Sequence, residues 1–252
     1  MLPSFKPKTY QDVKKTLIWY TIILLNIIAI LFYYLIISPT QRNFVSSFMG
    51  TIEKPVPLIG PGMSLTFFTF VAWLLISIIE IHDKVYDKYF VKWRYWYSID
   101  FIFPTLFRPF TDNLPNHFFE EAKSHVYDFM KVFYYFVGDY ETKININLSL
   151  RFYEKVTKYW ITQINEILLF FSFIVILILK YFGDLKSNIA FNGLVFIIIF
   201  YLINRIFVKN TKIPVRSATN DEIEDIHKNH LSELEDELKN LCRKYGLSYG
   251  QN

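Results

Sequence analysis

The segment Ile167–Val208 reads ILLFFSFIVILILKYFGDLKSNIAFNGLVFIIIFYLINRIFV. Two apolar blocks, Ile167–Phe182 and Ile189–Val208, flank a short polar sequence. A helix that spans a bilayer needs roughly 17–25 mainly apolar residues. The first block is short, so its helix is expected to begin upstream, in the sequence YEKVTKYWITQINE at 153–166. The pattern predicts a transmembrane hairpin.

Two more apolar blocks, Leu17–Ile37 and Met63–Ile81, predict a second hairpin. The chain is therefore expected to be an all-α integral membrane protein with four transmembrane helices. A buried helix of a soluble protein can also be apolar on every side. The first block could instead be a signal peptide, but a signal core is about 7–15 residues long and ends at small residues. The block Leu17–Ile37 is longer than a signal core and has bulky residues at its end.

Composition narrows the class of protein and its origin. The 252 residues are 52% hydrophobic and 19% aromatic, above the roughly 45–50% apolar content of soluble domains. Few alanines and many Phe, Tyr, Ile, Lys and Asn residues fit AT-rich coding DNA of a low-GC bacterium, an acquired island or an organelle. A net charge of +4 is too small to imply a nucleic-acid partner. The single cysteine, Cys242, excludes an intramolecular disulfide and a cysteine-based metal site.

The basic residues predict the orientation, because they remain on the cytoplasmic side near membrane ends. The only basic residues in loops 38–62 and 183–188 are Arg42, Lys54 and Lys186. Both termini are therefore expected on the cytoplasmic or matrix side of a bacterial inner membrane or the mitochondrial inner membrane. The predicted regions are 1–16 inside, a hairpin at 17–81, an inside region at 82–166, a hairpin at 167–208 and an inside tail at 209–252. The basic clusters at the inside ends are Lys6, Lys8, Lys14 and Lys15; Lys84, Lys88, Lys92 and Arg94; Arg151, Lys155 and Lys158; and Arg205, Lys209, Lys212 and Arg216.

The inside region begins with the aromatic and basic sequence IHDKVYDKYFVKWRYWYSIDFIFPTLFRPF at 81–110. Such side chains favour the headgroup layer, where a ring or an aliphatic stem rests on lipid and a polar tip reaches water. The predicted membrane-surface anchors are Trp93, Arg94, Trp96 and Arg108. The alternative is an inner-face module whose core is built from the same rings.

Two amphipathic helices are expected beyond this segment. The first covers 116–137, turns at Gly138, and is followed by a helix from about 147 that joins the third span. In the tail, a capping box of Thr219 and Glu222 predicts a helix over about 220–245 that stops at Gly246. Its heptad-spaced leucines predict either self-association or docking on the inside region. These leucines are Leu231, Leu234, Leu238 and Leu241.

No catalytic or metal-binding motif occurs, so we expect no enzyme, no cofactor and no metal. The amide side chains within the predicted spans are those of Asn26, Asn192 and Asn204. A buried amide usually joins transmembrane helices by a hydrogen bond. The functional alternative is a polar residue that lines a pore.

Three classes of function remain open. The first is an oligomeric pore-forming or membrane-perturbing effector, suited by its organisation to a bacterial antiviral defence system. The second is a structural or accessory subunit of a large membrane complex, such as an organelle-encoded respiratory complex. The third is a small membrane enzyme or carrier. The expected partners are the lipid bilayer and either further copies or other subunits, bound through the inside region and the C-terminal helix, and nucleic acid is not expected.

Overall fold

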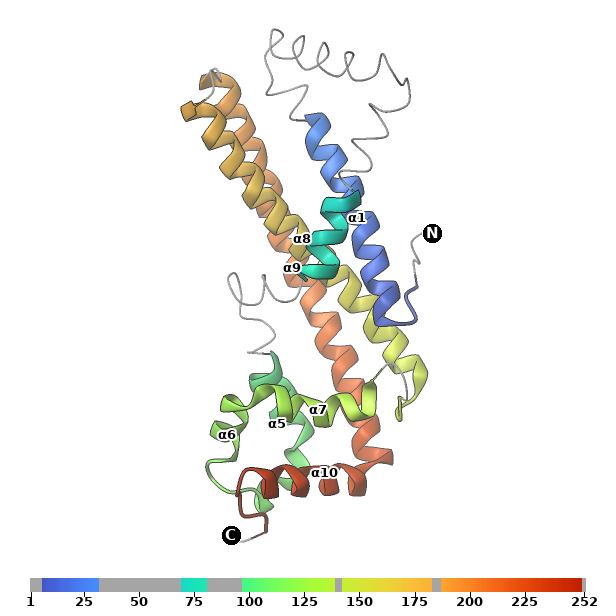
Figure 1. The fold of residues 1–252 in the computed structure, drawn as a ribbon. Coiled ribbons are helices and arrows are strands. Elements are labelled where there is room, and N and C mark those ends of the chain that lie inside the picture. Colours follow the sequence, from blue (N-terminus) through green and yellow to red (C-terminus); the bar gives the residue numbers. More distant parts are fainter. Residues whose placement is uncertain (1–5, 32–68, 81–96, 139–141, 183–186, 251–252) are drawn as a thin grey trace. The chain divides into compact units, whose positions relative to one another are not determined.

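The computed structural model describes residues 6–31, 69–80, 97–138, 142–182 and 187–250, drawn as coloured ribbon in Figure 1. Within these ranges the chain is helical and contains no strand, which confirms the all-α prediction. Contacts divide the chain into two units. Unit 1 takes residues 1–4, 11–84 and 157–210, and unit 2 takes 5–10, 85–156 and 211–252.

Unit 1 is built from α1, a short helix at Thr69–Ile78, and parts of two long helices. The helix α8 begins well before Ile167, which confirms that the predicted third span starts upstream. Two of the predicted spans lie in helices long and apolar enough to cross a membrane, namely Ile146–Ile178 and Ala190–Asn229. The bounds are α1 Tyr10–Leu31, the π-helical turn η2 Leu74–Ile78, α8 Ile146–Phe182 and α9 Ser187–Asn229.

The other two predicted spans are described in part. Residues 17–31 of the first lie in α1, and residues 32–37 lie outside the described part of the chain. In the second, Thr69–Ile78 is an apolar helix, whereas residues 63–68 and 81 lie outside that part. Four spans therefore stay a prediction.

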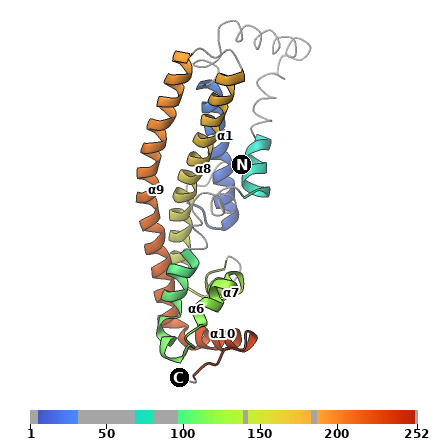
Figure 2. The ribbon, with the colours of Figure 1, turned by 90° about the vertical axis from the view of Figure 1, so that its left-hand side faces the viewer.

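The hairpin helices α8 and α9 lie side by side in unit 1 (Figures 1 and 2). Their shared core contains Ile176, Ala190 and Ile197, with further aliphatic and aromatic side chains packed around it. In the most apolar stretch of α9 only 11% of residues are buried, compared with 44% in α8. Large apolar side chains of α9 therefore remain exposed, among them Phe191, Phe196, Ile198, Ile199, Phe200, Leu202, Ile203, Ile206 and Phe207.

Unit 2 has an aromatic core. The Phe118 ring contacts Phe107 and Phe129 with ring centroids 5.5 and 5.3 Å apart, and Phe129 lies 5.9 Å from Phe103. Phe103 and Phe107, which belong to the aromatic segment 81–110, thus contribute to this core. For the described part of that segment, this favours the interpretation as an inner-face module. The elements are η4 Ser98–Ile102, α5 Phe103–Leu106, η5 Arg108–Asn113, α6 Phe118–Ser124, α7 Val126–Val137 and α10 Leu231–Lys244, with the ends of α8 and α9.

The predicted membrane-surface anchors are described in one case only. Trp93, Arg94 and Trp96 lie outside the described residues, and Arg108 is exposed.

The single helix predicted over 116–137 is wrong, because it breaks at His125, where φ is −124° and ψ is 38°. The His125 ring stacks on Tyr245 at 4.4 Å between centroids, and its Nε2 lies 3.0 Å from Glu121 Oε1. The His125 N–H still donates to the Glu121 carbonyl and its carbonyl accepts from the Phe129 N–H, so the break lies in the φ and ψ of His125 rather than in the loss of these bonds.

The predicted start of the tail helix is also wrong. The helix α9 runs on to Asn229, so Thr219 lies inside it and caps nothing. Its hydroxyl donates to the Val215 carbonyl at 3.2 Å. A new helix, α10, begins only at Leu231.

The predicted stop of the tail helix is confirmed. Gly246 has φ of +66°, a value that favours glycine. Its N–H donates to the Arg243 carbonyl, and the Leu247 N–H donates to the Cys242 carbonyl, as in a Schellman motif.

Candidate functional site

Amide side chains and one tyrosine join three helices of unit 1. The Asn204 Nδ2 on α9 donates to the main-chain carbonyl of Thr162 on α8 at 2.9 Å. The Asn204 Oδ1 accepts from Asn165 Nδ2 at 3.4 Å, and Asn165 Oδ1 accepts from the Tyr20 hydroxyl on α1 at 2.8 Å. Asn204 and Thr162 are buried, so these bonds satisfy polar groups that water does not reach.

An ion pair lies one residue further along both helices. Arg205 Nη1 donates to Glu166 Oε1 at 2.9 Å. The Glu166 side chain is 6% exposed and the Arg205 side chain 49%. A buried carboxylate requires such a partner, and the exposed arginine can extend its charge towards a headgroup or water.

A third polar group here has no partner. Gln163 is 1% exposed, and neither its Nε2 nor its Oε1 makes a hydrogen bond in the described structure. A buried polar group left unpaired costs about 1–3 kcal/mol. We call the set Tyr20, Thr162, Gln163, Asn165, Glu166, Asn204 and Arg205 the polar joint.

The two ends of the predicted first hairpin are also tied together. Lys14 Nζ, near the start of α1, donates to Glu80 Oε1 at 2.9 Å, directly after the helix Thr69–Ile78. Both side chains are largely buried. This pair holds the beginning of one predicted span beside the end of the other.

The chemistry of the polar joint is that of a structural junction. Amides and a neutral hydroxyl hold helices by hydrogen bonds but supply no activated nucleophile. Among the described residues, no three His, Cys, Asp or Glu side chains are grouped so as to hold a metal ion.

The three asparagines predicted within the spans lie in different environments. Asn204 is at the centre of the polar joint. Asn26 donates to the Ile22 carbonyl of its own helix at 2.8 Å, so this bond does not join α1 to another helix. Asn192 is exposed on α9.

The predicted association seam is placed differently from expectation. Leu234 and Leu238 are fully buried and Leu241 is 8% exposed, whereas Leu231 is 41% exposed. The helix α10 packs on α7 within the same chain. Docking on α7, one of the two predicted alternatives, thus accounts for the spacing of the buried leucines, and self-association through this helix stays a prediction.

Ion pairs at both ends of α10 support this docking. Asp128 on α7 pairs with Lys244 and accepts from the Tyr245 hydroxyl at 2.7 Å. At the other end, Glu233 pairs with Lys143 and accepts from the Tyr135 hydroxyl at 2.8 Å. Hydrogen bonds from Lys244, Tyr245 and Lys131 lower the pKa of Asp128 far below its ordinary value. We call these two groups of contacts the α10 clamp.

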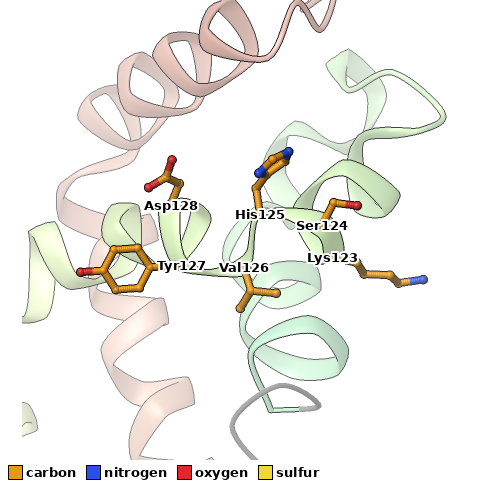
Figure 3. Close-up of a pocket in the computed structure, with 6 residues that line it drawn as sticks. All are labelled: Lys123, Ser124, His125, Val126, Tyr127 and Asp128. Atoms are coloured by element: carbon orange, nitrogen blue, oxygen red, sulfur yellow. The ribbon is translucent and has the colours of Figure 1, made fainter.

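An open hollow of about 460 Å³ lies at the break between α6 and α7. Figure 3 shows His125 and Asp128 on one side of the ribbon and Val126 on the other. The charged residues here are paired: Lys123 with Glu120 at 2.7 Å, and Asp128 with Lys131 at 2.9 Å. These pairs favour a solvated surface over a binding site. The lining residues are Lys123, Ser124, His125, Val126, Tyr127 and Asp128.

The sequence contains a partial signal for members of the polar joint other than Asn204. The sequence ITQINE at 161–166 places Glu166 three residues after Gln163 and four after Thr162, directly before an apolar block. That spacing puts polar groups on adjoining faces of a continuous helix. The partners of Thr162 and Glu166 lie on α9, and such tertiary contacts leave no local signal.

Comparison with known proteins identifies a family. The profile of the YmfE protein family matches residues 10–239, and the chain belongs to this family. Comparison with curated proteins and with solved structures found no match.

Proposed function

We propose that this member of the YmfE family is a multi-pass membrane protein that self-associates and alters the permeability of the bilayer. The observation that carries the proposal is the apolar stretch of α9, of which 11% is buried. The core helix of a soluble protein is mostly buried, whereas a lipid-facing helix exposes large apolar side chains on several sides. The two long apolar helices suggest membrane association, and insertion is part of the proposal.

Contacts inside unit 1 support the predicted arrangement of the spans. The pair Lys14–Glu80 joins the start of the first predicted span to the end of the second. The bond from Asn204 to Thr162 joins the end of the fourth to the helix that enters the third. Such pairing is expected if each hairpin begins and ends on one side of a membrane.

Self-association is supported by α9 rather than by α10. Asn192 is an exposed amide on a helix whose neighbouring exposed residues include Phe191 and Phe196. In lipid, an amide gains by bonding to another helix, with an average contribution near 0.6 kcal/mol and up to about 2 kcal/mol. A second copy of α9 offers the same amide and the same apolar surface.

The test uses the full chain purified from membranes and placed in lipid nanodiscs and in dye-loaded vesicles. We expect a homo-oligomer by mass measurement and dye release that rises with the amount of inserted protein. Asn192→Leu should lower the oligomer fraction and the dye release together. Ser232→Leu, a change at an exposed position on α10 in unit 2, is the control that should alter neither.

Two outcomes would contradict the proposal. A monomer that inserts but releases no dye would remove the permeability function. Purification in fixed ratio with other proteins, without self-association, would favour the structural subunit instead.

A further inference from the structure

Glu222 occupies a position in unit 2 where an apolar side chain is expected. Val215, Thr219 and Ile226 are buried on α9 at three- and four-residue steps around it. Glu222 belongs to the same stripe and is 1% exposed. A buried helix stripe at this spacing is ordinarily apolar.

The Glu222 carboxyl lacks the partner that a buried charge requires. Its Oε2 is buried and makes no hydrogen bond in the described structure. Burial, and to a smaller extent the charge of Asp221, raise the pKa of Glu222 from 4.5 to about 8. An ionised carboxylate at this place would be costly, because no hydrogen-bond donor described around its Oε2 replaces the lost water.

The surroundings of Glu222 are held by hydrogen bonds to other elements. The Tyr97 hydroxyl donates to Thr219 Oγ1 at 2.7 Å, one turn before Glu222. Arg151 on α8 pairs with Asp221, and a ring nitrogen of His227 bonds the Leu106 carbonyl at 2.8 Å. These bonds connect this half of α9 to Tyr97 directly before η4, to the end of α5 and to the beginning of α8.

Those elements carry several charged or titratable groups. Asp221 is paired with Arg151 and so repels an ionised Glu222 less than a free carboxylate would. Lys155 is paired with Glu154 at 3.8 Å. The charged or titratable groups on these elements and on the unit 2 part of α9 are Tyr97, Asp100, Arg151, Tyr153, Glu154, Lys155, Lys212, Arg216, Asp221, Glu224, Asp225, His227 and Lys228.

We propose that Glu222 is a proton-operated switch that keeps the C-terminal half of α9 packed in unit 2 while it is neutral and releases it when it ionises. The direction follows from linkage between protonation and folding. A carboxyl whose pKa is higher in the packed state stabilises that state fully below its ordinary pKa of 4.5. This stabilisation is lost as the pH rises through about 8. Between these values, the equilibrium constant for opening rises about tenfold for each pH unit.

The experiment measures amide hydrogen exchange of residues 215–229 in the full chain in nanodiscs, at about pH 5.5, 6.5 and 7.5. The wild type is compared with Glu222→Gln, which keeps the shape of the side chain and removes its titration. The ratio of the two rates cancels the intrinsic effect of pH on exchange. The matched control is Glu224→Gln, two residues away and exposed.

We expect the wild-type rate, divided by the Glu222→Gln rate, to rise about tenfold per pH unit in this window. The same ratio with Glu224→Gln should stay level. Glu222→Met, an apolar side chain of similar length, should behave as Glu222→Gln does. Level ratios with both Glu222 variants would overturn the proposal.

A second measurement uses the wild type alone, so it does not depend on whether a variant folds. The infrared band of a protonated carboxylic acid should be present in the wild type at neutral pH and vanish on titration to alkaline pH. Its absence at neutral pH would also overturn the proposal.

Discussion

The Asn204 side chain on α9 donates a 2.9 Å hydrogen bond to the main-chain carbonyl of Thr162 on α8. A carbonyl oxygen has two lone pairs, so it can accept this bond together with one from its own helix. The bond fixes the two helices in register next to the ion pair of buried Glu166 and exposed Arg205. It makes Asn204 the most consequential of the three amides predicted within the spans.

Replacing Asn204 by leucine should weaken the packing of α8 on α9. The change removes the donor to Thr162 and the acceptor for Asn165, and each transmembrane hydrogen bond contributes about 0.6–2 kcal/mol. Thermal unfolding in detergent should occur at a lower temperature. Asn26→Leu is the control, because the described bond of Asn26 lies within its own helix, and a loss as large as that of Asn204→Leu would contradict the assignment.

Tyr20 and Asn165 should show energetic coupling in a double-mutant cycle. Tyr20→Phe removes the hydroxyl that donates to Asn165 at 2.8 Å, and should cost about 1 kcal/mol. In an Asn165→Leu background the same change should cost much less. Equal costs in the two backgrounds would show that α1 is not joined to α8 through this bond.

Gln163→Leu should stabilise unit 1. The amide is buried with both polar atoms unpaired, and an apolar side chain of similar size removes that penalty of about 1–3 kcal/mol. The unfolding temperature should rise relative to the wild type, while Gln163→Glu should lower it. A destabilised Gln163→Leu variant would mean that the amide is satisfied in the membrane-embedded protein.

Asp128→Asn should loosen α10. The change removes the charge that pairs with Lys244 and Lys131, so one end of the α10 clamp is lost. Cys242 is 1% exposed, and its reactivity towards a thiol reagent should rise several-fold when α10 loosens. The matched control is Asp236→Asn, an exposed position on the same helix.

The wild type should show the same loosening on acidification. The pKa of Asp128 is lowered in the folded state, so its contribution is present above the ordinary value of 3.8. The contribution is lost as the pH falls through the folded value. The measurement is the extent of Cys242 labelling in acid, compared between the wild type and Asp128→Asn at equal thiolate fraction. An identical acid response in both proteins would exclude Asp128 as the group responsible.

The sequence predicted what depends on local pattern. The apolar run of Ile189–Val208 identified a long helix, and Gly246 identified a helix end, because length and backbone freedom are local properties. The break at His125 was missed because it depends on stacking against Tyr245, a residue distant in sequence.

Tertiary contacts also explain why local patterns in the tail were not sufficient. Thr219 and Glu222 have the spacing of a capping box, yet both are buried within α9, where packing outweighs that local signal. The leucines of α10 have the spacing of a seam, and only the folded chain shows that α7 already covers them. For the same reason the polar joint could be predicted at Asn204 and not at Gln163 or Tyr20.

If α8 and α9 cross a membrane as a hairpin, residue 186 lies on the opposite side of the membrane from residues 140 and 252. A reporter fused after Lys186 should read outside, whereas reporters after residue 140 and after Asn252 should read inside. Readings on the same side for all three positions, or recovery of the chain without membranes, would show that the two helices do not cross.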